Sequence, residues 1–400
     1  MPVYLPPRFI PMSVRARQKR YISQPIRWHK KKMILNIANR LTKLRQSLAE
    51  KEIDGIFVSL PENRYYLSGF DGAAGYLLVT PQDTVLATDF RYVEQAKIQA
   101  PDYQIFQITG NMSDWFPRLV AELILSKLGF EAKHFTFAMY RQLSDILNKA
   151  KSKPKLTPVE GLVESLRAIK EPEEIELITQ AAEITDKAFE HIESVVHIGM
   201  TEKEIAWEIE RFMRENGSLP LPFDVIVASG PNAALPHAKP SPRQINSGEP
   251  VIIDIGARIG GYASDLSRTI CLGTPDDTFK KVYGTVLGAQ LTALAIIKEG
   301  MSGGEADSLA RIVIEKAGYD AAFGHGLGHG VGLAIHEQPR LGPNSTDLLT
   351  SGMVFTIEPG IYLTGWGGVR IEDLGVMENN GIRVLSKARK VNNTKVDHIA

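Results

Sequence analysis

The chain has 400 residues, of which 44% are hydrophobic, and it carries 46 basic and 46 acidic side chains. This length suggests two or three domains, and zero net charge gives no general attraction to nucleic acid. The short run Lys30-Lys31-Lys32 has only Trp28 beside it, so we expect no nucleic-acid partner there. No apolar run reaches the roughly 18 residues needed to span a bilayer. The single cysteine, Cys271, excludes an intrachain disulfide and fits a reducing, cytoplasmic compartment.

The charge is unevenly distributed along the chain. Residues 1–32 contain nine Lys or Arg and no acid, which leaves 37 basic and 46 acidic residues in the rest, a net charge of −9. A segment rich in Arg and free of acids is typical of an organelle transit peptide. The alternative, which we favour, is a disordered basic tail or a start assigned too early, with Met33 as the true start.

Residues 33–160 show the alternating pattern of an α/β domain. Helical spacing predicts an amphipathic helix from Ile37 to Lys51, and the short apolar run Gly55–Ser59 predicts a strand. A strand pair is expected around Pro81-Gln82-Asp83, followed by a helix from Phe90 and a strand from Tyr103 to Ile108. We also predict a helix from Trp115 to Leu128. This domain contains no recognisable catalytic cluster.

A helix start at Glu171-Pro172 marks the second domain, because Pro and acids favour the first helical turn. We place the boundary between Pro158 and Lys170 and assign residues 161–400 to this domain. It contains an internal repeat. Gly199-Met200-Thr201 is echoed by Gly300-Met301-Ser302, each with a Glu three residues after the Thr or Ser, and His237-Ala-Lys-Pro is echoed by His336-Glu-Gln-Pro. Each half therefore offers one His and two carboxylates.

The first pair of carboxylates lies on a predicted hairpin. Val251–Ile255 reads as a buried strand, and a turn centred on Ile259-Gly260 places Asp254 directly opposite Asp265. Like charges so placed destabilise a sheet, and a bound cation would remove that repulsion. The alternative is a different register in which one Asp faces solvent. The repeat favours metal binding, since a solvated surface has no reason to repeat this order of residues.

The second half supplies Glu358 and Glu372, which are candidate bridging ligands. Arg370 lies two residues before Glu372 and therefore on the same side of its strand. It could fix a ligand carboxylate or a substrate carbonyl, or form a plain salt bridge to one of these acids. His325 and His329 lie in a segment with Gly at every second position, which argues against a helix and for close backbone packing. We expect one of them to be a ligand and the other to support it.

Four carboxylates and one His form an oxygen-dominated set, which suits Mn²⁺ or Mg²⁺ better than a structural Zn²⁺. Bridging carboxylates fit a two-metal site that activates water and polarises a carbonyl, so the expected reaction is metal-assisted hydrolysis. Gly300-Met-Ser-Gly-Gly304 matches a serine-hydrolase elbow. However, a helical pattern precedes it, and Ser302 reads better as a helix N-cap.

With these residues in place, the sequence resembles the Xaa-Pro peptidases of the pita-bread fold, aminopeptidase P and prolidase. The resemblance covers roughly residues 36–385 and rests on Phe223–Pro240, Val251–Thr269, His325–Pro339 and Gly352–Asp373. It implies a creatinase-like N-terminal domain followed by an α/β (α+β) pita-bread catalytic domain with a pseudo-two-fold repeat. In the family the first domain helps to cover the site and to form a homodimer. The basic first 32 residues lie outside the family pattern.

The resemblance also assigns roles to residues. It implies five ligands for two divalent ions, most simply Mn²⁺ with Co²⁺ or Zn²⁺ as alternatives: Asp254, Asp265, His329, Glu358 and Glu372. It implies that Glu358 is also the general base toward a metal-bridging hydroxide. It further implies that His237 and His336 bind substrate and stabilise the tetrahedral intermediate, with His325 and Arg370 in support.

The sequence does not separate an Xaa-Pro aminopeptidase from an Xaa-Pro dipeptidase. We favour the aminopeptidase, because a dipeptidase must hold the proline carboxylate and no second basic residue is evident near the site. Methionine aminopeptidases share the ligand set but usually lack the first domain. A metal-free binding protein of the same fold is a remote alternative, since such proteins lack several ligands and this chain retains all five.

Overall fold

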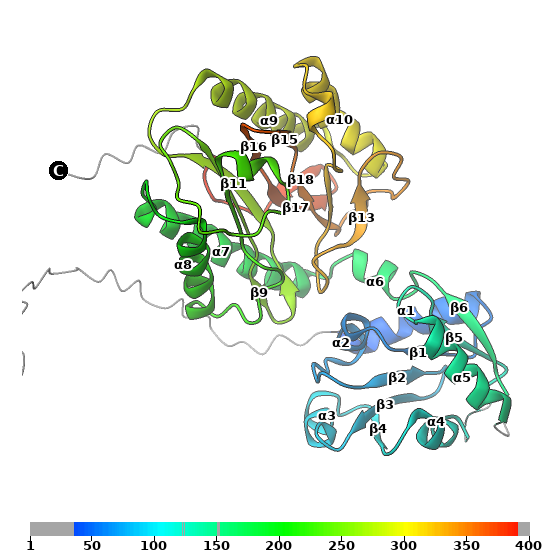
Figure 1. Cartoon of the computed structure of the whole chain (residues 1–400). Helices are drawn as coiled ribbons and strands as arrows, with labels where there is room; N and C mark the ends of the chain where they lie inside the picture. Colours follow the sequence, from blue (N-terminus) through cyan, green and yellow to red (C-terminus); the bar gives the residue numbers. More distant parts are fainter. Residues whose placement is uncertain (1–35, 122, 124, 150–152, 391–400) are drawn as a thin grey trace, which may run out of the picture. The chain divides into compact units, whose positions relative to one another are not determined.

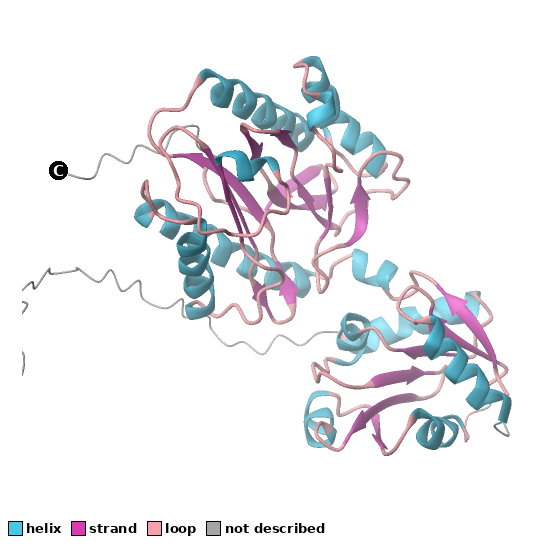
Figure 2. Ribbon diagram, in the orientation of Figure 1, coloured by secondary structure: helices cyan, strands magenta, loops and turns pink. Residues whose placement is uncertain are grey.

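The computed structural model describes residues 36–121, 123, 125–149 and 153–390, all of which belong to one unit. The basic segment 1–32, whether tail or transit peptide, lies outside the described residues. Helices surround the strands (Figures 1 and 2). None of the described helices is long and apolar enough to cross a membrane.

The first part of the chain is a layered α/β structure. Its elements are α1 (Ile37–Glu50), β1 (Gly55–Val58), α2 (Pro61–Ser68), β2 (Tyr76–Val79), β3 (Thr84–Asp89), α3 (Val93–Gln99), β4 (Gln104–Ile108), α4 (Met112–Val120), β5 (Lys127–Glu131), α5 (Phe137–Lys149), β6 (Lys155–Val159) and α6 (Glu164–Ala168). The strands form one mixed sheet in the order β4-β3-β2-β1-β5-β6.

Both faces of this sheet are buried. Along β1, Ile56 and Val58 belong to the core that includes Leu44 of α1, whereas Phe57 belongs to the core that includes Trp115 of α4. This alternation follows from the period of two in a strand. Helices therefore cover the sheet on two sides, which confirms the α/β prediction for this part.

One predicted element of this part is wrong. The helix expected from Trp115 to Leu128 ends at Val120, and residues 127–131 form β5, which pairs in parallel with β1 and β6. Short apolar runs do not distinguish a strand from a buried helix. Here the sheet decides, because Leu128 fills the core beside Phe57.

The second part contains the predicted repeat. Its elements are α7 (Pro172–Val195), α8 (Glu202–Glu215), β7 (Ile226–Ser229), the 3-10 helix η1 (Gly230–Ala234), β8 (Pro250–Ile255), β9 (Arg258–Ile259), β10 (Tyr262–Ala263), β11 (Leu266–Cys271), α9 (Asp277–Ile296), α10 (Gly303–Lys316), η2 (Asp320–Ala322), β12 (Gly328–Gly330), β13 (Glu337–Leu341), β14 (Val354–Ile357), β15 (Gly360–Leu363), β16 (Gly367–Arg370), β17 (Asp373–Glu378) and β18 (Gly381–Val384). The main sheets run β11-β8-β7 and β13-β12-β14-β17-β18.

The two halves of this part repeat each other at the level of hydrogen bonds. Thr201 caps α8 in a capping box with Glu204, and Ser302 caps α10 in the same way with Glu305. The amide of Gly199 donates to Ile245 O at 2.9 Å, and that of Gly300 donates to Leu349 O at 2.8 Å. The repeat is therefore structural, and Ser302 is a helix cap, as predicted.

The hairpin register differs from the prediction. Strands β8 and β11 pair Asp254 with Ser267, not with Asp265. The turn is centred on Gly260-Gly261, with φ of +56° and +87°, because a tight hairpin turn favours positive φ at both central residues and only glycine adopts it freely. The shift is two residues, so Asp254 and Asp265 still face the same side of the hairpin, now as diagonal neighbours.

Candidate active site

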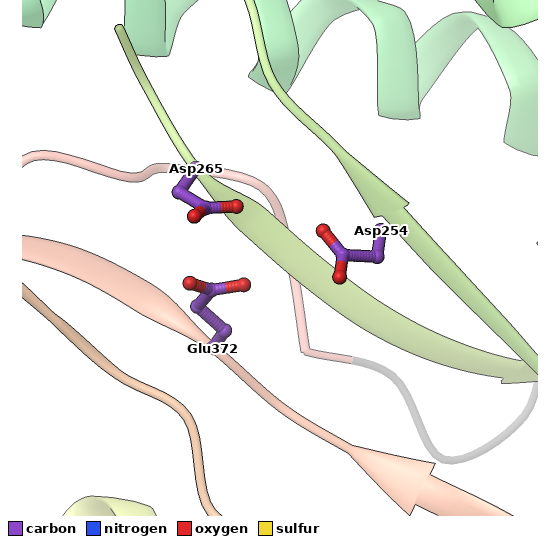
Figure 3. A group of neighbouring side chains, drawn as sticks. All are labelled: Asp254, Asp265 and Glu372. Carbon is purple, nitrogen blue, oxygen red and sulfur yellow. The ribbon is translucent and has the colours of Figure 1, made fainter. Parts of the chain in front are cut away.

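Three carboxylates converge beside the hairpin. Asp254 comes from the end of β8, Asp265 precedes β11, and Glu372 lies between β16 and β17; Figure 3 shows their side chains pointing toward one another. One carboxylate oxygen from each lies within 4.8 Å of those of the other two. The backbone joins the two halves here, since the amide of Glu372 donates to Ser267 O at 3.0 Å.

This acidic cluster is unfavourable without a cation. Burial, together with the neighbouring acids, raises the pKa of Asp265 and of Glu372 well above the ordinary value, and burial also raises the pKa of Asp254. The Oδ1 atom of Asp254 is buried and has no hydrogen-bond partner among the residues that the structure describes. A buried acceptor without a partner calls for an explanation, and a cation among these carboxylates supplies one.

His329 and Glu358 complete the predicted set of five. The Nε2 atom of His329 lies 3.3 Å from Glu358 Oε1 and 3.7 Å from Asp265 Oδ2. Thr356 fixes this pair, because its hydroxyl donates to Glu358 Oε1 at 3.0 Å and accepts from the His329 amide at 3.1 Å. The five side chains predicted as ligands therefore gather at one place.

Glu358 and His329 perturb each other. Burial raises the pKa of Glu358, but the hydrogen bond and charge of His329 outweigh it and lower the pKa to about 2. Burial alone would lower the pKa of His329. The hydrogen bond and charge of Glu358 outweigh burial, so the pKa of His329 is raised above its ordinary value. A cation bound at Nε2 of His329 would replace this hydrogen bond.

Arg370 is buried and pairs with one of the acids. Its guanidinium donates to Asp254 Oδ2 at 2.5 Å, Ser267 Oγ at 2.8 Å, Tyr362 OH at 2.9 Å and Pro236 O at 3.1 Å. The salt bridge considered from sequence is thus present. Because Arg370 also reaches the backbone beside His237, it ties the two halves of the site together.

His325 supports the site through a tyrosine that the sequence analysis missed. Its Nδ1 lies 2.8 Å from Gly326 O, and its Nε2 lies 2.9 Å from Tyr362 OH, which also accepts from Arg370. Tyr362 lies on β15 and pairs with Gly368 of β16, and no pattern in the sequence singles it out. The glycines of this segment allow the close packing predicted for them: a Cβ on Gly328 would lie 2.0 Å from Thr356 O.

His237 and His336 line the cleft above the acidic cluster. Both are exposed, and the imidazole rings of His336 and His329 have centroids 4.2 Å apart. The cleft has a volume of about 1490 Å³, and its walls include the five candidate ligands, His325 and Arg370. Lys239 and Arg340 line it as well. The expectation that no second basic residue lies near the site is therefore wrong, because a loop of the first half and strand β13 of the second half bring these side chains to the same cleft.

Comparisons with known proteins agree with this geometry. Residues 176–379 match the model of metallopeptidase family M24, and residues 40–169 match that of the creatinase/prolidase N-terminal domain. The chain is 37% identical to an Xaa-Pro dipeptidase from Pyrococcus furiosus over 360 residues, 88% of this chain and 98% of the relative.

Solved structures show the same similarity over the whole length of the neighbours. An Xaa-Pro dipeptidase from Bacillus anthracis superposes with a TM-score of 0.85 and 43% identity, covering 89% of this chain and 99% of the other. An X-Pro aminopeptidase from Thermotoga maritima superposes with a TM-score of 0.79 and 36% identity, covering 86% of this chain and 99% of the other. These matches confirm the expected creatinase-like first domain and pita-bread catalytic domain.

Proposed function

Because the chain belongs to metallopeptidase family M24 and is a hydrolase, we propose that it removes the N-terminal residue from peptides with proline in the second position. The observation that carries this proposal is the convergence of five potential ligands in a cleft lined by His237 and His336. One of the ligand atoms is a buried Asp254 oxygen that has no partner within the described part of the chain. The Thermotoga maritima neighbour is named an X-Pro aminopeptidase.

The donor set fits two divalent ions. Most of the donor atoms are oxygens, which favours Mn²⁺, with Co²⁺ or Zn²⁺ as alternatives. The residues that would hold the ions are Asp254, Asp265, His329, Glu358 and Glu372. When bound, such a pair activates a water molecule near neutral pH and polarises the scissile carbonyl. Elemental analysis after reconstitution tests this assignment, and binding of fewer than two ions per chain at saturation would contradict it.

The side chains around this set have distinct tasks in the proposal. Glu358 accepts the proton of the attacking water and delivers it to the leaving nitrogen. His237 and His336 bind the peptide and donate to the oxygen that becomes negative in the transition state. Arg370 and His325 hold Tyr362 between them and thereby stiffen the wall of the site.

Dipeptide hydrolysis is the second candidate function. Lys239 and Arg340 line the cleft and carry the positive charge that recognition of a terminal proline carboxylate needs. The relative from Pyrococcus furiosus and the neighbour from Bacillus anthracis are both named Xaa-Pro dipeptidases. The open cleft of about 1490 Å³ favours the aminopeptidase, because it leaves room for residues beyond proline.

One assay separates the two candidates. The metal-loaded protein is offered an Xaa-Pro dipeptide, the matching Xaa-Pro-Yaa tripeptide and the N-acetylated tripeptide. We expect cleavage of the tripeptide and resistance of the acetylated form, because the reaction needs a free N-terminus. Cleavage of the dipeptide alone would establish the dipeptidase, and cleavage of neither would contradict the proposed function.

We also propose that the protein is a cytoplasmic homodimer. The dimer is what the family resemblance implies, and light scattering of the purified chain tests it. A cytoplasmic location fits the single buried, free cysteine. Imaging of fluorescent fusions with and without residues 1–32 tests the location and shows whether this segment directs import into an organelle.

A further inference from the structure

One buried ion-pair cluster lies next to the candidate active site and has no part in the mechanism above. Glu337 follows His336 directly, and its side chain is only 6% exposed. Its Oε2 accepts from Arg167 at 2.5 Å, and its Oε1 lies 2.7 Å from Lys170 Nζ. Both cations come from α6 and the residues just after it, the segment that joins the two parts of the chain.

The carboxylate of Glu337 also folds back on the loop that carries His336. The Ala334 amide donates to its Oε2 at 3.4 Å, and a Cβ on Gly332 would lie 2.3 Å from Oε1, so the carboxylate packs against that backbone. At the start of β13, Glu337 pairs with Gly330, the residue after His329. The position of Glu337 therefore sets where His336 lies relative to His329.

The cations are anchored independently of Glu337. Arg167 donates to Asn63 Oδ1 at 2.8 Å, and Asn63 in turn donates to the buried Glu131 at 2.7 Å. The amide of Lys170 donates to Gly352 O at 2.9 Å. These anchors leave the two cations little freedom to follow Glu337 if it moves. Arg167 and Lys170, which we call the clamp, therefore hold the loop that carries His336, and the loop does not position the cations.

The repeat shows that this clamp is specific to the second half. The residue after His237 is Ala238, which is buried and has no charge, whereas the residue after His336 is Glu337. Fold alone does not require a carboxylate at this place, since the first half forms its loop without one.

We propose that Glu337 is a positioning residue that, clamped by Arg167 and Lys170, holds His336 over the candidate active site. The segment joining the two parts of the chain thereby contributes to substrate turnover. This inference rests on the proposed function only for the role of His336; the clamp itself is independent of the reaction.

A double-mutant cycle tests the coupling. Glu337→Gln keeps the shape of the side chain and removes its charge, and it is combined with His336→Ala in the metal-loaded full chain. We expect Glu337→Gln to lower kcat/KM for an Xaa-Pro-Yaa tripeptide at least about tenfold, and less than about twofold in the His336→Ala background, because coupled residues are not additive. An equal factor in both backgrounds would overturn the proposal.

Two further variants keep the test decisive. If Glu337→Gln does not fold, Lys170→Met takes its place in the cycle, since Arg167 still pairs with Glu337 there. Glu171→Gln is the matched control, because Glu171 pairs with Arg40 at 3.0 Å and joins the same two parts of the chain away from His336. We expect the control to stay within about twofold of wild type.

A measurement that does not need activity separates this inference from the proposed function. In protein with ¹³C-labelled histidine, Glu337→Gln or Lys170→Met should shift the ring signal of His336, assigned with His336→Ala, and Glu171→Gln should not. An unmoved His336 signal in both clamp variants would refute the coupling. Absence of proline-peptide cleavage by the wild type would instead refute the proposed function.

Discussion

Replacing Asp265 by Asn should have opposite effects on stability with and without metal. Asp265 shares its site with Asp254 and Glu372, and their carboxylate oxygens lie within 4.8 Å of one another. At that distance two unit charges repel by about 3.5 kcal/mol for an effective dielectric of 20. Burial and, after it, this repulsion both favour the protonated carboxyl, so the pKa of Asp265 is raised well above its ordinary value.

Whether Asp265→Asn raises or lowers the free energy of unfolding depends on whether a cation neutralises the Asp265 carboxylate in the folded protein. In the metal-free protein Asp265 contributes burial cost and repulsion, so Asp265→Asn should raise the free energy of unfolding by about 1–3 kcal/mol. In the metal-loaded protein the same change removes a ligand. A ligand at 100 times its Kd stabilises by about 2.7 kcal/mol, and much of that should be lost.

The assay is thermal unfolding of wild type and variant after chelation and after reconstitution with Mn²⁺. We expect the variant to melt several degrees above wild type without metal and below it with metal. Asp277→Asn is the control, because Asp277 is fully exposed and its ion pair is with the exposed Lys280. A variant that is less stable than wild type in both states would refute the reasoning, as would a wild type whose stability does not respond to chelation.

Three other predictions follow from particular residues. Glu358→Gln should lower kcat by about three orders of magnitude or more with the fold intact, since nucleophile and base act as a unit; retention of a tenth of the activity would contradict its role. A chain starting at Met33 should keep its stability and activity, and a melting temperature lower by several degrees would contradict this. Burial raises the pKa of Glu337, but Lys170 and Arg167 outweigh it and lower the pKa below 4.5. Its contribution to stability is therefore complete above pH 4.5 and lost as pH falls through the lowered value, so the stability difference between wild type and Glu337→Gln should shrink in acid and persist at neutral pH.

The hairpin shows what the sequence can and cannot determine. A period of two along a strand was enough to place Asp254 and Asp265 on one face. It could not fix the register, because moving the turn from Ile259-Gly260 to Gly260-Gly261 shifts the pairing by two residues and leaves that face unchanged. The predicted site is unaffected by this error in register, since side chains that are diagonal neighbours remain close enough to bind the same cation.

Other features lay beyond local pattern. Lys239 lies in a loop and Arg340 in β13, and neither position carries a sequence pattern that points to the site; only the folding of two distant halves brings them to one cleft. Tyr362 acquires its importance from His325 and Arg370, which lie 37 positions before it and 8 after it. Such contacts depend on tertiary packing, which residue spacing in the sequence does not encode.

The two halves of the repeat hold their histidine loops by different means. On the first side Glu202 of α8 is fully buried and accepts from the backbone amides and hydroxyls of Ser229 and Ser241, which frame the loop leading to His237. On the second side the carboxylate of Glu337, at the start of β13, pairs with Arg167 of α6 and with Lys170, which come from the segment that joins the two parts of the chain. His237 is therefore held by the catalytic part alone, whereas His336 depends on contacts outside the repeat. Although the fold is pseudo-symmetric, only one of its two histidine loops depends on the first domain. Substitutions in that domain should therefore change the position of His336 and leave that of His237 unchanged.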